Sequence, residues 1–262
     1  MDLTMDLAAA TGLRSPTQVA RAVTETWVER NLYCPQCGYP SLAKYPNNKP
    51  VADFHCTDCR AEYELKSGSH LGANTPRVPD GAYETMINRI TSNSNPHLLL
   101  LHYRDVAVRD LRVIPKFFFT PAVIQRRAPL APGARRAGWV GCNIIIGDLP
   151  KVASVAIVVE GAALPNDTVV GAFATASQLS TSSLADRGWL LDTWTIVEQV
   201  SDATGAFTLG DMYAHEAAIA ARWPGNRNVR PKIRQQLQVL RDRGMIEFLG
   251  NGTYRRLQGR AV

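Results

Sequence analysis

Four cysteines, arranged as two close pairs, constrain the fold of this chain more than any other feature of its sequence. The pairs are Cys34-Pro-Gln-Cys37 and Cys56-Thr-Asp-Cys59, and eighteen residues separate them. Two residues between cysteines let one tight turn present both thiolates to a single ion, and two such turns are typical of a zinc site. The alternative, a pair of disulfides, is disfavoured in a cytosolic chain, which would keep them reduced. We therefore predict a closed, tetrahedral site for structural zinc.

Composition and hydropathy predict a cytoplasmic protein that does not enter a membrane. Charged residues make up 20% of the 262 residues and hydrophobic residues 45%, which is ordinary for a soluble globular chain. The longest apolar stretches, at residues 98–101 and 152–159, have the length of strands and are too short to span a bilayer. The N-terminal residues lack the basic segment of a secretory signal.

The position of the net charge is more informative than its size. The last 58 residues contain 10 Lys and Arg against 4 Asp and Glu, which accounts for the whole net charge of +6. Residues 1–204 are balanced. A basic domain at the end of the chain is suited to binding a polyanion, although a merely solvated basic surface would give the same count.

Apolar periodicity predicts an α/β domain of residues 1–182 followed by a smaller domain of residues 183–262. Val19, Val23 and Trp27 recur every four residues and predict a capped helix over residues 17–30. Beyond Gly161 the apolar pattern weakens and residues 177–183 are rich in Ser and Thr, which places the boundary there. The remaining elements expected in the first domain are strands at residues 51–55, 62–67, 98–103, 111–115, 140–146 and 153–159, a loop at 67–79, a helix near 81–91, and a polar, proline-containing segment at 120–138.

The second domain has the pattern of an α+β winged helix. Helices are expected at residues 207–214, 216–223 and 231–243, the last with Ile233, Leu237 and Leu240 at spacings of four and three. Short strands at residues 245–248 and 253–257 then flank a tight Gly-Asn-Gly turn. A winged helix ends in this way, with a helix that leads into a tight hairpin.

The strongest catalytic pattern places one acid on a short strand and an acid and a lysine on the next. Asp53 lies on the first strand, and Glu64-Leu65-Lys66 lies on the second. Side chains alternate faces along a strand, so Glu64 and Lys66 point the same way while Leu65 points into the core. If the strands pair, Asp53 comes beside Glu64, and two carboxylates offer the hard oxygen ligands that Mg²⁺ prefers. The lysine can orient or activate water and stabilise charge on a phosphate.

This arrangement is that of the PD-(D/E)xK nucleases. It predicts Asp53, Glu64 and Lys66 as catalytic residues, with Asp53 and Glu64 binding Mg²⁺. Glu-x-Lys alone is also common as a surface charge pair on solvated strands. The cysteines favour the catalytic interpretation, because the second pair lies in the connection between the two strands. A zinc ion there would hold together the hairpin that carries the magnesium ligands.

Basic residues gather in two further places that suit DNA. Arg135 and Arg136 lie in the polar segment, from which they can contact phosphates. Trp139 follows them and could form the wall of a pocket for a methyl group or a base. The residues alone favour the other interpretation of Trp139, a core tryptophan at the start of a strand.

The second group of basic and amide side chains lies on and just before the helix predicted over residues 231–243, which is the expected recognition helix of the winged-helix domain. Gln can bond adenine in the major groove, and Arg can bond guanine or phosphate. A protein-binding winged helix with a charged face is the alternative, and the concentration of positive charge argues against it. The candidate DNA-binding residues on this helix are Arg230, Lys232, Arg234, Gln235 and Gln238.

Along most of its length the sequence resembles the DpnI-type restriction endonucleases. The stretch at residues 233–242 is very specific, and so is the order of all the matching segments. The other segments that carry the resemblance are Tyr33-Cys34-Pro35 with Cys37-Gly38, Pro50-Val51-Ala52-Asp53-Phe54, Glu64-Leu65-Lys66-Ser67, Asp80-Gly81-Ala82-Tyr83, Leu130-Ala131-Pro132, residues 134–139, Gly141-Cys142-Asn143-Ile144, Arg187-Gly188-Trp189 and Asp211-Met212-Tyr213.

The resemblance implies a PD-(D/E)xK nuclease core with an embedded four-cysteine zinc site, followed by a winged helix. It implies a Mg²⁺-dependent type II endonuclease that acts on double-stranded DNA at GATC containing N6-methyladenine. We expect the protein to be a monomer, although the sequence does not determine its oligomeric state on DNA. By position, Asp53, Glu64 and Lys66 become the catalytic residues, and Cys34, Cys37, Cys56 and Cys59 the zinc ligands. Trp139 becomes part of the surface that senses the methyl group.

Two alternatives remain open. A non-enzymatic regulator with a zinc module and a winged helix would read methylated DNA without cutting it. That alternative explains the cysteines and the basic tail, but not why two acids and a lysine converge beside the cysteines. A nuclease with another target, such as unmethylated or single-stranded DNA, is opposed only by the family resemblance.

Overall fold

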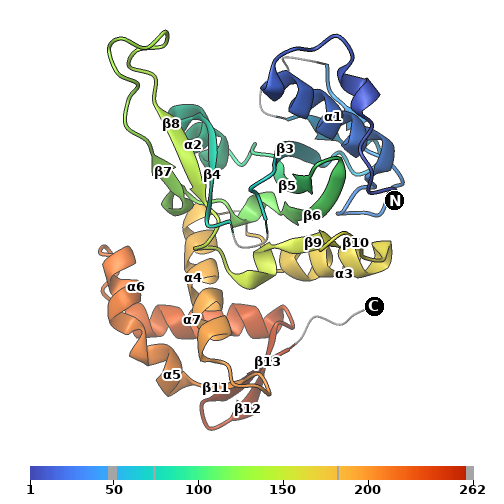
Figure 1. The fold of residues 1–262 in the computed structure, drawn as a ribbon. Helices are drawn as coiled ribbons and strands as arrows, with labels where there is room; N and C mark the ends of the chain where they lie inside the picture. The colour runs from blue at the N-terminus through green and yellow to red at the C-terminus, as the bar shows by residue number, and fades with distance from the viewer. Residues whose placement is uncertain (47–51, 73–74, 182, 258–262) are drawn as a thin grey trace.

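The computed structural model describes residues 1–46, 52–72, 75–181 and 183–257. It has an α/β core in its first part and a separate group of helices with a small sheet in its last part (Figure 1). Residue 51, where the first catalytic strand was expected to begin, and residue 182, where the predicted domain boundary falls, lie outside the described residues.

A seven-stranded sheet forms the centre of the first part, with strand order β1-β2-β3-β5-β6-β9-β10. All neighbouring pairs are antiparallel except β3 and β5, which run parallel. Its strands are β1 (Ala43–Lys44), β2 (Phe54–His55), β3 (Glu62–Gly68), β5 (His97–Arg104), β6 (Ala107–Ile114), β9 (Val155–Val159) and β10 (Ala162–Ala163).

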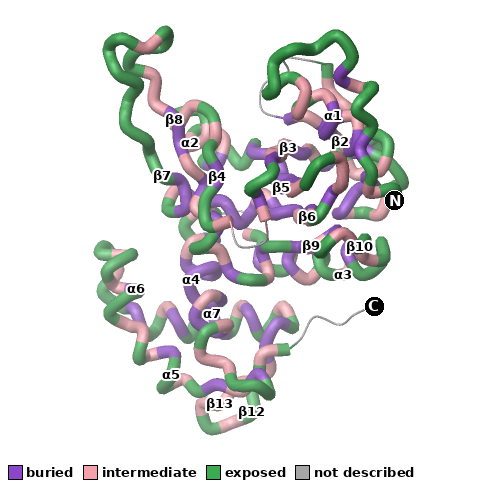
Figure 2. Tube along the Cα trace, in the orientation of Figure 1, coloured by how far each residue is buried: buried purple, intermediate pink, exposed green. Residues whose placement is uncertain are grey.

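Helices cover this sheet and bury the first five residues of its central strand, β5. Helix α1 (Pro16–Asn31) packs against β3, and α3 (Asn166–Ser177) packs against β9. Leu98 to Leu101 of β5 are all buried although they alternate in direction, so both faces of the strand are covered (Figure 2). In α1 the predicted spacing is confirmed, because Val23 and Trp27 face the core. Its Ser15 makes no side-chain capping bond, and Pro16 begins the helix.

A second, three-stranded sheet stands beside the first, in the order β4-β8-β7. Its strands are β4 (Arg77–Ala82), β7 (Ile124–Arg126) and β8 (Gly141–Ile145), and α2 (Tyr83–Thr91) packs against all three. The loop predicted at residues 67–79 is wrong at its end, because β4 begins at Arg77. Pro79 is tolerated there because β4 is an edge strand of this sheet. Residues 127–140, between β7 and β8, project from the body and are mostly exposed (Figures 1 and 2).

The last part contains four helices and a three-stranded sheet, in the order β11-β13-β12. The helix predicted over residues 207–214 is wrong at its start. Phe207 pairs with Tyr254 in the sheet, and the helix begins only after Thr208, whose side chain forms a capping box with Asp211. The elements are α4 (Leu184–Val200), β11 (Ala206–Thr208), α5 (Leu209–Ala214), α6 (Glu216–Arg222), α7 (Val229–Asp242), β12 (Ile246–Gly250) and β13 (Thr253–Arg256).

The expected fold class is confirmed: a mixed α/β core with an embedded four-cysteine cluster precedes a smaller domain of helices with a β-hairpin. Helix α3, in the region where the apolar pattern weakens, was not expected; it buries Val169, Phe173 and Ala176. No helix among the described residues is long and apolar enough to cross a bilayer. The described residues also form four short 3-10 helices: η1 (Leu7–Ala10), η2 (Lys116–Phe118), η3 (Pro121–Val123) and η4 (Lys151–Ala153).

Candidate functional site

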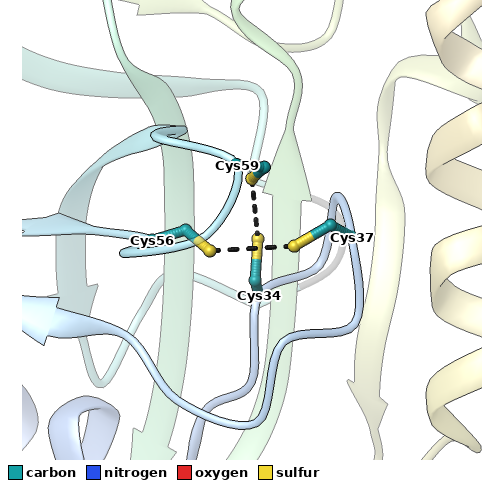
Figure 3. A group of neighbouring side chains, drawn as sticks. All are labelled: Cys34, Cys37, Cys56 and Cys59. Carbon is teal, nitrogen blue, oxygen red and sulfur yellow. Dashed lines mark hydrogen bonds between the residues drawn. The ribbon is translucent and has the colours of Figure 1, made fainter.

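The four paired cysteines meet at one point, as the sequence predicts. The four sulfur atoms lie within 4.8 Å of one another (Figure 3). The Sγ atoms of Cys34 and Cys59 are 3.6 Å apart, and those of Cys37 and Cys56 are 3.7 Å apart. Ligands about 2.3 Å from a tetrahedral zinc ion are separated by about 3.8 Å. The donor set therefore fits structural zinc and leaves no open coordination position.

Each cysteine pair lies in a turn that points its thiols inward. The residue after each pair, Gly38 and Arg60, has a positive φ of 79° and 60° respectively, which closes the turn behind the second cysteine. Backbone N–H groups of Cys59 and Asp58 donate to the Cys56 sulfur and, against the effect of burial, lower the pKa of that thiol. Burial raises the pKa of the Cys34 thiol to about 11, so this ligand depends on the charge of a metal to become a thiolate.

The cysteine cluster is joined directly to the strands that carry the predicted catalytic residues. Cys56 follows β2, and Cys59 precedes β3 by two residues. Tyr63 of β3 is fully buried, and its hydroxyl lies 3.1 Å from the Cys34 sulfur, so the cluster is also tied to the strand from the side. A metal held by the four thiolates would thus fix the spacing of β2 and β3.

Asp53, Glu64 and Lys66 are brought together by the pairing of these two strands. Phe54 pairs with Tyr63, which places Asp53 opposite Glu64. The Asp53 carboxylate is held against β3 because its Oδ2 accepts a hydrogen bond of 2.8 Å from the Leu65 backbone N–H. The Lys66 Nζ lies 2.7 Å from Glu64 Oε1, on the same face of the strand. The juxtaposition expected from the sequence is present, whereas the catalytic roles of these residues stay predictions.

Burial and mutual repulsion make this group of charges receptive to a cation. Burial, with a further contribution from Asp80 and Asp53, raises the pKa of Glu64 to about 7, although Lys66 opposes the shift. Burial also raises the pKa of Asp53. Burial alone would lower the pKa of Lys66, but the Glu64 and Asp80 carboxylates outweigh it and raise that pKa. Two neighbouring carboxylates that resist ionisation are a donor set that a divalent cation would stabilise, and their oxygens are of the type Mg²⁺ binds.

Two charged residues near this site were not expected from the sequence. Asp80 of β4 places its Oδ1 2.6 Å from Lys66 Nζ and is buried, with 4% of its side chain exposed. Arg21 of α1 lies 3.9 Å from Asp53 Oδ1. The sequence offered a signal only for Asp80, which belongs to a segment that carries the family resemblance. Neither its burial nor its partner follows from local pattern.

A cavity of about 300 Å³ opens beside Glu64, Lys66 and Asp80. Its other walls come from α2, from the start of β5 and the residues just before it, from Phe119 and from Ile144 of β8. The cavity borders the catalytic candidates from the side of the second sheet. The face of β3 that carries Glu64 and Lys66 therefore borders a cavity and is not closed in the core.

Arg135, Arg136 and Trp139 lie on the projecting loop, residues 127–140. Both arginines are exposed, and the Arg136 guanidinium lies 4.8 Å from the centre of the Trp139 ring. Trp139 is partly exposed and packs close to Gly141, where an added Cβ would approach the ring to 2.8 Å. Trp139 is therefore not a core residue. An arginine stacked on a tryptophan, at the tip of the second sheet, can contact a duplex.

Helix α7 presents some, but not all, of its candidate DNA-binding residues on one exposed face. Arg234, Gln235 and Gln238 are exposed. Arg230 is exposed as well and is held by Glu216, at 2.7 Å, above the Tyr213 ring.

Lys232 does not join this group. Its side chain is 20% exposed, lies 3.4 Å from Asp186 and extends over the Trp189 ring of α4. Lys232 precedes Arg234 by two positions, which corresponds to a rotation of about 200° around the helix axis. Its side chain therefore faces α4 and not the exposed side of α7.

Comparison with known protein families gives two matches that adjoin along the chain. The family model DpnI, described as the Dam-replacing family, matches residues 1–182. The model DpnI_C, described as the Dam-replacing HTH domain, matches residues 185–256. The first match includes the cysteine cluster and the hairpin from Asp53 to Lys66, and the second includes α7.

Proposed function

Because the chain belongs to the Dam-replacing (DpnI) family, we propose that it is a type II restriction endonuclease that hydrolyses double-stranded DNA at GATC sites containing N6-methyladenine. The family supports a nuclease whose action depends on methylation, and the helix-turn-helix domain supports DNA as the partner. The observation that carries the proposal is the Asp53 carboxylate fixed beside Glu64 and Lys66, two residues that line the cavity.

In this proposal Asp53 and Glu64 hold Mg²⁺, and Lys66 assists the reaction. When bound, Mg²⁺ would act as a Lewis acid and lower the pKa of a bound water, which supplies the nucleophile. The Leu65 N–H fixes Asp53 through Oδ2, and the other oxygen, Oδ1, lies 3.9 Å from the Arg21 guanidinium. The Lys66 ammonium would orient water and stabilise the negative charge that develops on the phosphate.

Two separate parts of the chain are proposed to contact DNA near the methyl group. Trp139 offers a partly exposed aromatic face at the tip of the second sheet, which suits a methyl group on an adenine edge. Arg135 and Arg136 beside it suit the phosphates. In the last domain Gln235 and Gln238 suit adenine in the major groove, with Arg230 and Arg234 on guanine or phosphate. Fit around one methyl group discriminates by only about 1–3 kcal/mol, so two readers in succession would increase selectivity.

The direct test uses one plasmid in two forms, adenine-methylated at GATC and unmethylated, incubated with the protein and Mg²⁺. Discrete fragments from the methylated form alone are expected. Cleavage of both forms would retain the nuclease and contradict the dependence on methylation. Absence of cleavage, together with a gel shift selective for methylated DNA, would instead support a non-enzymatic regulator.

Replacing a single carboxylate tests the assignment of the site. Asp53→Asn preserves the shape of the side chain but removes the charge that binds the cation, so we expect cleavage to be lost while binding of methylated DNA is retained. The matched control is Asp110→Asn, which removes a partly buried carboxylate paired with His102 elsewhere on the same sheet. Cleavage by Asp53→Asn at the rate of this control would refute the assignment.

A further inference from the structure

Lys66 is held between two carboxylates from different sheets. Its Nζ lies 2.7 Å from Glu64 Oε1, on its own strand, and 2.6 Å from Asp80 Oδ1, on β4. Of the three side chains Asp80 is the most deeply buried, with 4% exposed, against 17% for Glu64 and 23% for Lys66. The Asp80 carboxylate therefore lies in the protein interior, where a charged group is stable only when an opposite charge compensates it.

The backbone of β4 places Asp80 at this point. The pairing of β4 with β8 shifts register between Asp80 and Ala82, so Gly81 forms a bulge. Bulges redirect a side chain, and they are common next to active sites. The Gly81 N–H then donates to Asp80 Oδ1 at 2.7 Å, so this oxygen accepts from both Gly81 and Lys66. The other oxygen, Oδ2, is buried and has no hydrogen-bond partner among the described residues.

We propose that Asp80 is a positioning residue for Lys66, an inference that rests on the proposed nuclease function. Glu64 cannot serve as the sole anchor of the ammonium, because in that function its carboxylate also binds Mg²⁺. Asp80 comes from the second sheet, lines the same cavity as Glu64 and Lys66, and keeps its ion pair with Lys66 when Glu64 engages the cation. It thereby holds the Lys66 ammonium where the water and the scissile phosphate meet.

This role differs from that of a third metal ligand. Asp80 Oδ1 already accepts two hydrogen bonds, and the Lys66 ammonium lies between this oxygen and Glu64 Oε1. A positioning residue acts only through Lys66. A metal ligand acts independently of Lys66 and changes the amount of Mg²⁺ that the enzyme needs. The two roles therefore predict different results when both residues are replaced.

The test compares single-turnover cleavage of the methylated plasmid by the full-length wild type, Asp80→Asn, Lys66→Met and the double variant. Rates are normalised to the protein that binds methylated DNA in a gel shift, and Asp110→Asn is the control for loss of a partly buried carboxylate. We expect Asp80→Asn to reduce the rate by about 10- to 100-fold, the usual effect of losing a group that orients a catalytic residue. In the Lys66→Met background the same substitution should change the rate by less than about twofold, because the two act as a unit. The Mg²⁺ concentration for half-maximal rate should stay the same.

Several results would overturn the proposal. A wild-type rate in Asp80→Asn would show that Lys66 needs no second anchor. Additive losses in the double variant, or a raised Mg²⁺ requirement, would make Asp80 a metal ligand. An Asp80→Asn protein that bound no methylated DNA would assign the residue to folding. A wild type that cleaved neither plasmid form would refute the proposed function, and this inference with it, whereas cleavage by the wild type with an unaffected Asp80→Asn refutes the inference alone.

Discussion

Two buried tyrosines next to the cysteine cluster differ in one respect, and this difference makes a sharp prediction. The Tyr63 hydroxyl lies 3.1 Å from the Cys34 sulfur. The Tyr33 hydroxyl is buried with no hydrogen-bond partner among the described residues. Replacing either residue with phenylalanine removes one oxygen and leaves the ring in place, so neither substitution creates a large cavity. The two variants therefore separate the hydrogen bond to sulfur from the packing of the ring.

The expected magnitudes follow from what each hydroxyl contacts. In the zinc-bound protein Cys34 is a thiolate, and a hydrogen bond to a charged acceptor contributes about 1.5–3 kcal/mol. Sulfur is a weaker acceptor than oxygen. We therefore expect Tyr63→Phe to lower the free energy of unfolding by about 1–2 kcal/mol. Tyr33→Phe removes a buried hydroxyl that gains no bond, so we expect it to be neutral or stabilising.

Metal retention gives the more specific readout. Partners of a metal ligand commonly change affinity by about 10- to 100-fold, so zinc should leave Tyr63→Phe correspondingly faster when a chelator with a coloured zinc complex is added. Urea titration of the zinc-loaded proteins measures the stability. Equal zinc release and equal unfolding free energies in the two variants would refute the conclusion that Tyr63 supports the cluster.

Four further substitutions test other parts of the molecule. Burial lowers the pKa of His97 to about 3. In the unfolded chain the imidazole takes up a proton near pH 6.5, whereas in the folded protein it stays neutral until the pH approaches 3. The free energy of unfolding should therefore be highest above pH 6.5 and fall as the pH is lowered from 6.5 toward 3, by up to about 1.4 kcal/mol per pH unit. Urea titrations between pH 7.5 and 5 should show that the free energy of unfolding falls less steeply with decreasing pH in His97→Asn than in the wild type, by this amount per pH unit. Trp139→Ala should lower the ratio of cleavage rates on methylated and unmethylated plasmid by about tenfold or more with no loss of thermal stability, since a methyl-sized fit contributes about 1–3 kcal/mol; an unchanged ratio would remove Trp139 from methyl sensing. Gln235→Ala should weaken binding of methylated DNA in a gel shift by about 1–3 kcal/mol, whereas Lys232→Met, on the side that faces α4, should bind within about twofold of the wild type; a stronger effect at Lys232 would contradict the placement of the two side chains.

The parts of the fold that could be predicted are those fixed by local pattern. Helix α1 shows its buried face through Val23 and Trp27, and the cysteine pairs show their turn through their own spacing. Glu64 and Lys66 share one face because a strand alternates, so their proximity needed only the assignment of β3 as a strand. In each case neighbours in sequence determine the geometry.

The parts that could not be predicted depend on contacts between distant segments. Strand β4 contains proline and glycine, and only its pairing with β8 makes it a strand, so Asp80 appeared to lie beside a loop. The spacing of Ile233 and Leu237 predicts which side of α7 faces the core. It does not predict which neighbouring element covers the side of the helix opposite Arg234. Because α4 covers it, Lys232 is placed against Trp189. Phe207 likewise belongs to a strand because it pairs with Tyr254, although the local sequence of residues 207–214 predicts a helix.

Strand β3 contributes to both proposed metal sites of the enzyme, the four-cysteine zinc site and the Mg²⁺ site, and the two sites differ in what they can do. Its Tyr63 faces the cysteine cluster, and its next residue, Glu64, faces the opposite side toward Asp53 and Lys66. The four sulfurs form a complete coordination sphere, so a metal there has no position left for water or phosphate. In the proposed function the chemistry therefore falls to Asp53, Glu64 and Lys66, and zinc affects cleavage through the geometry of the hairpin. It follows that removing zinc should abolish cleavage even in excess Mg²⁺, and that adding Mg²⁺ cannot compensate for the loss of zinc.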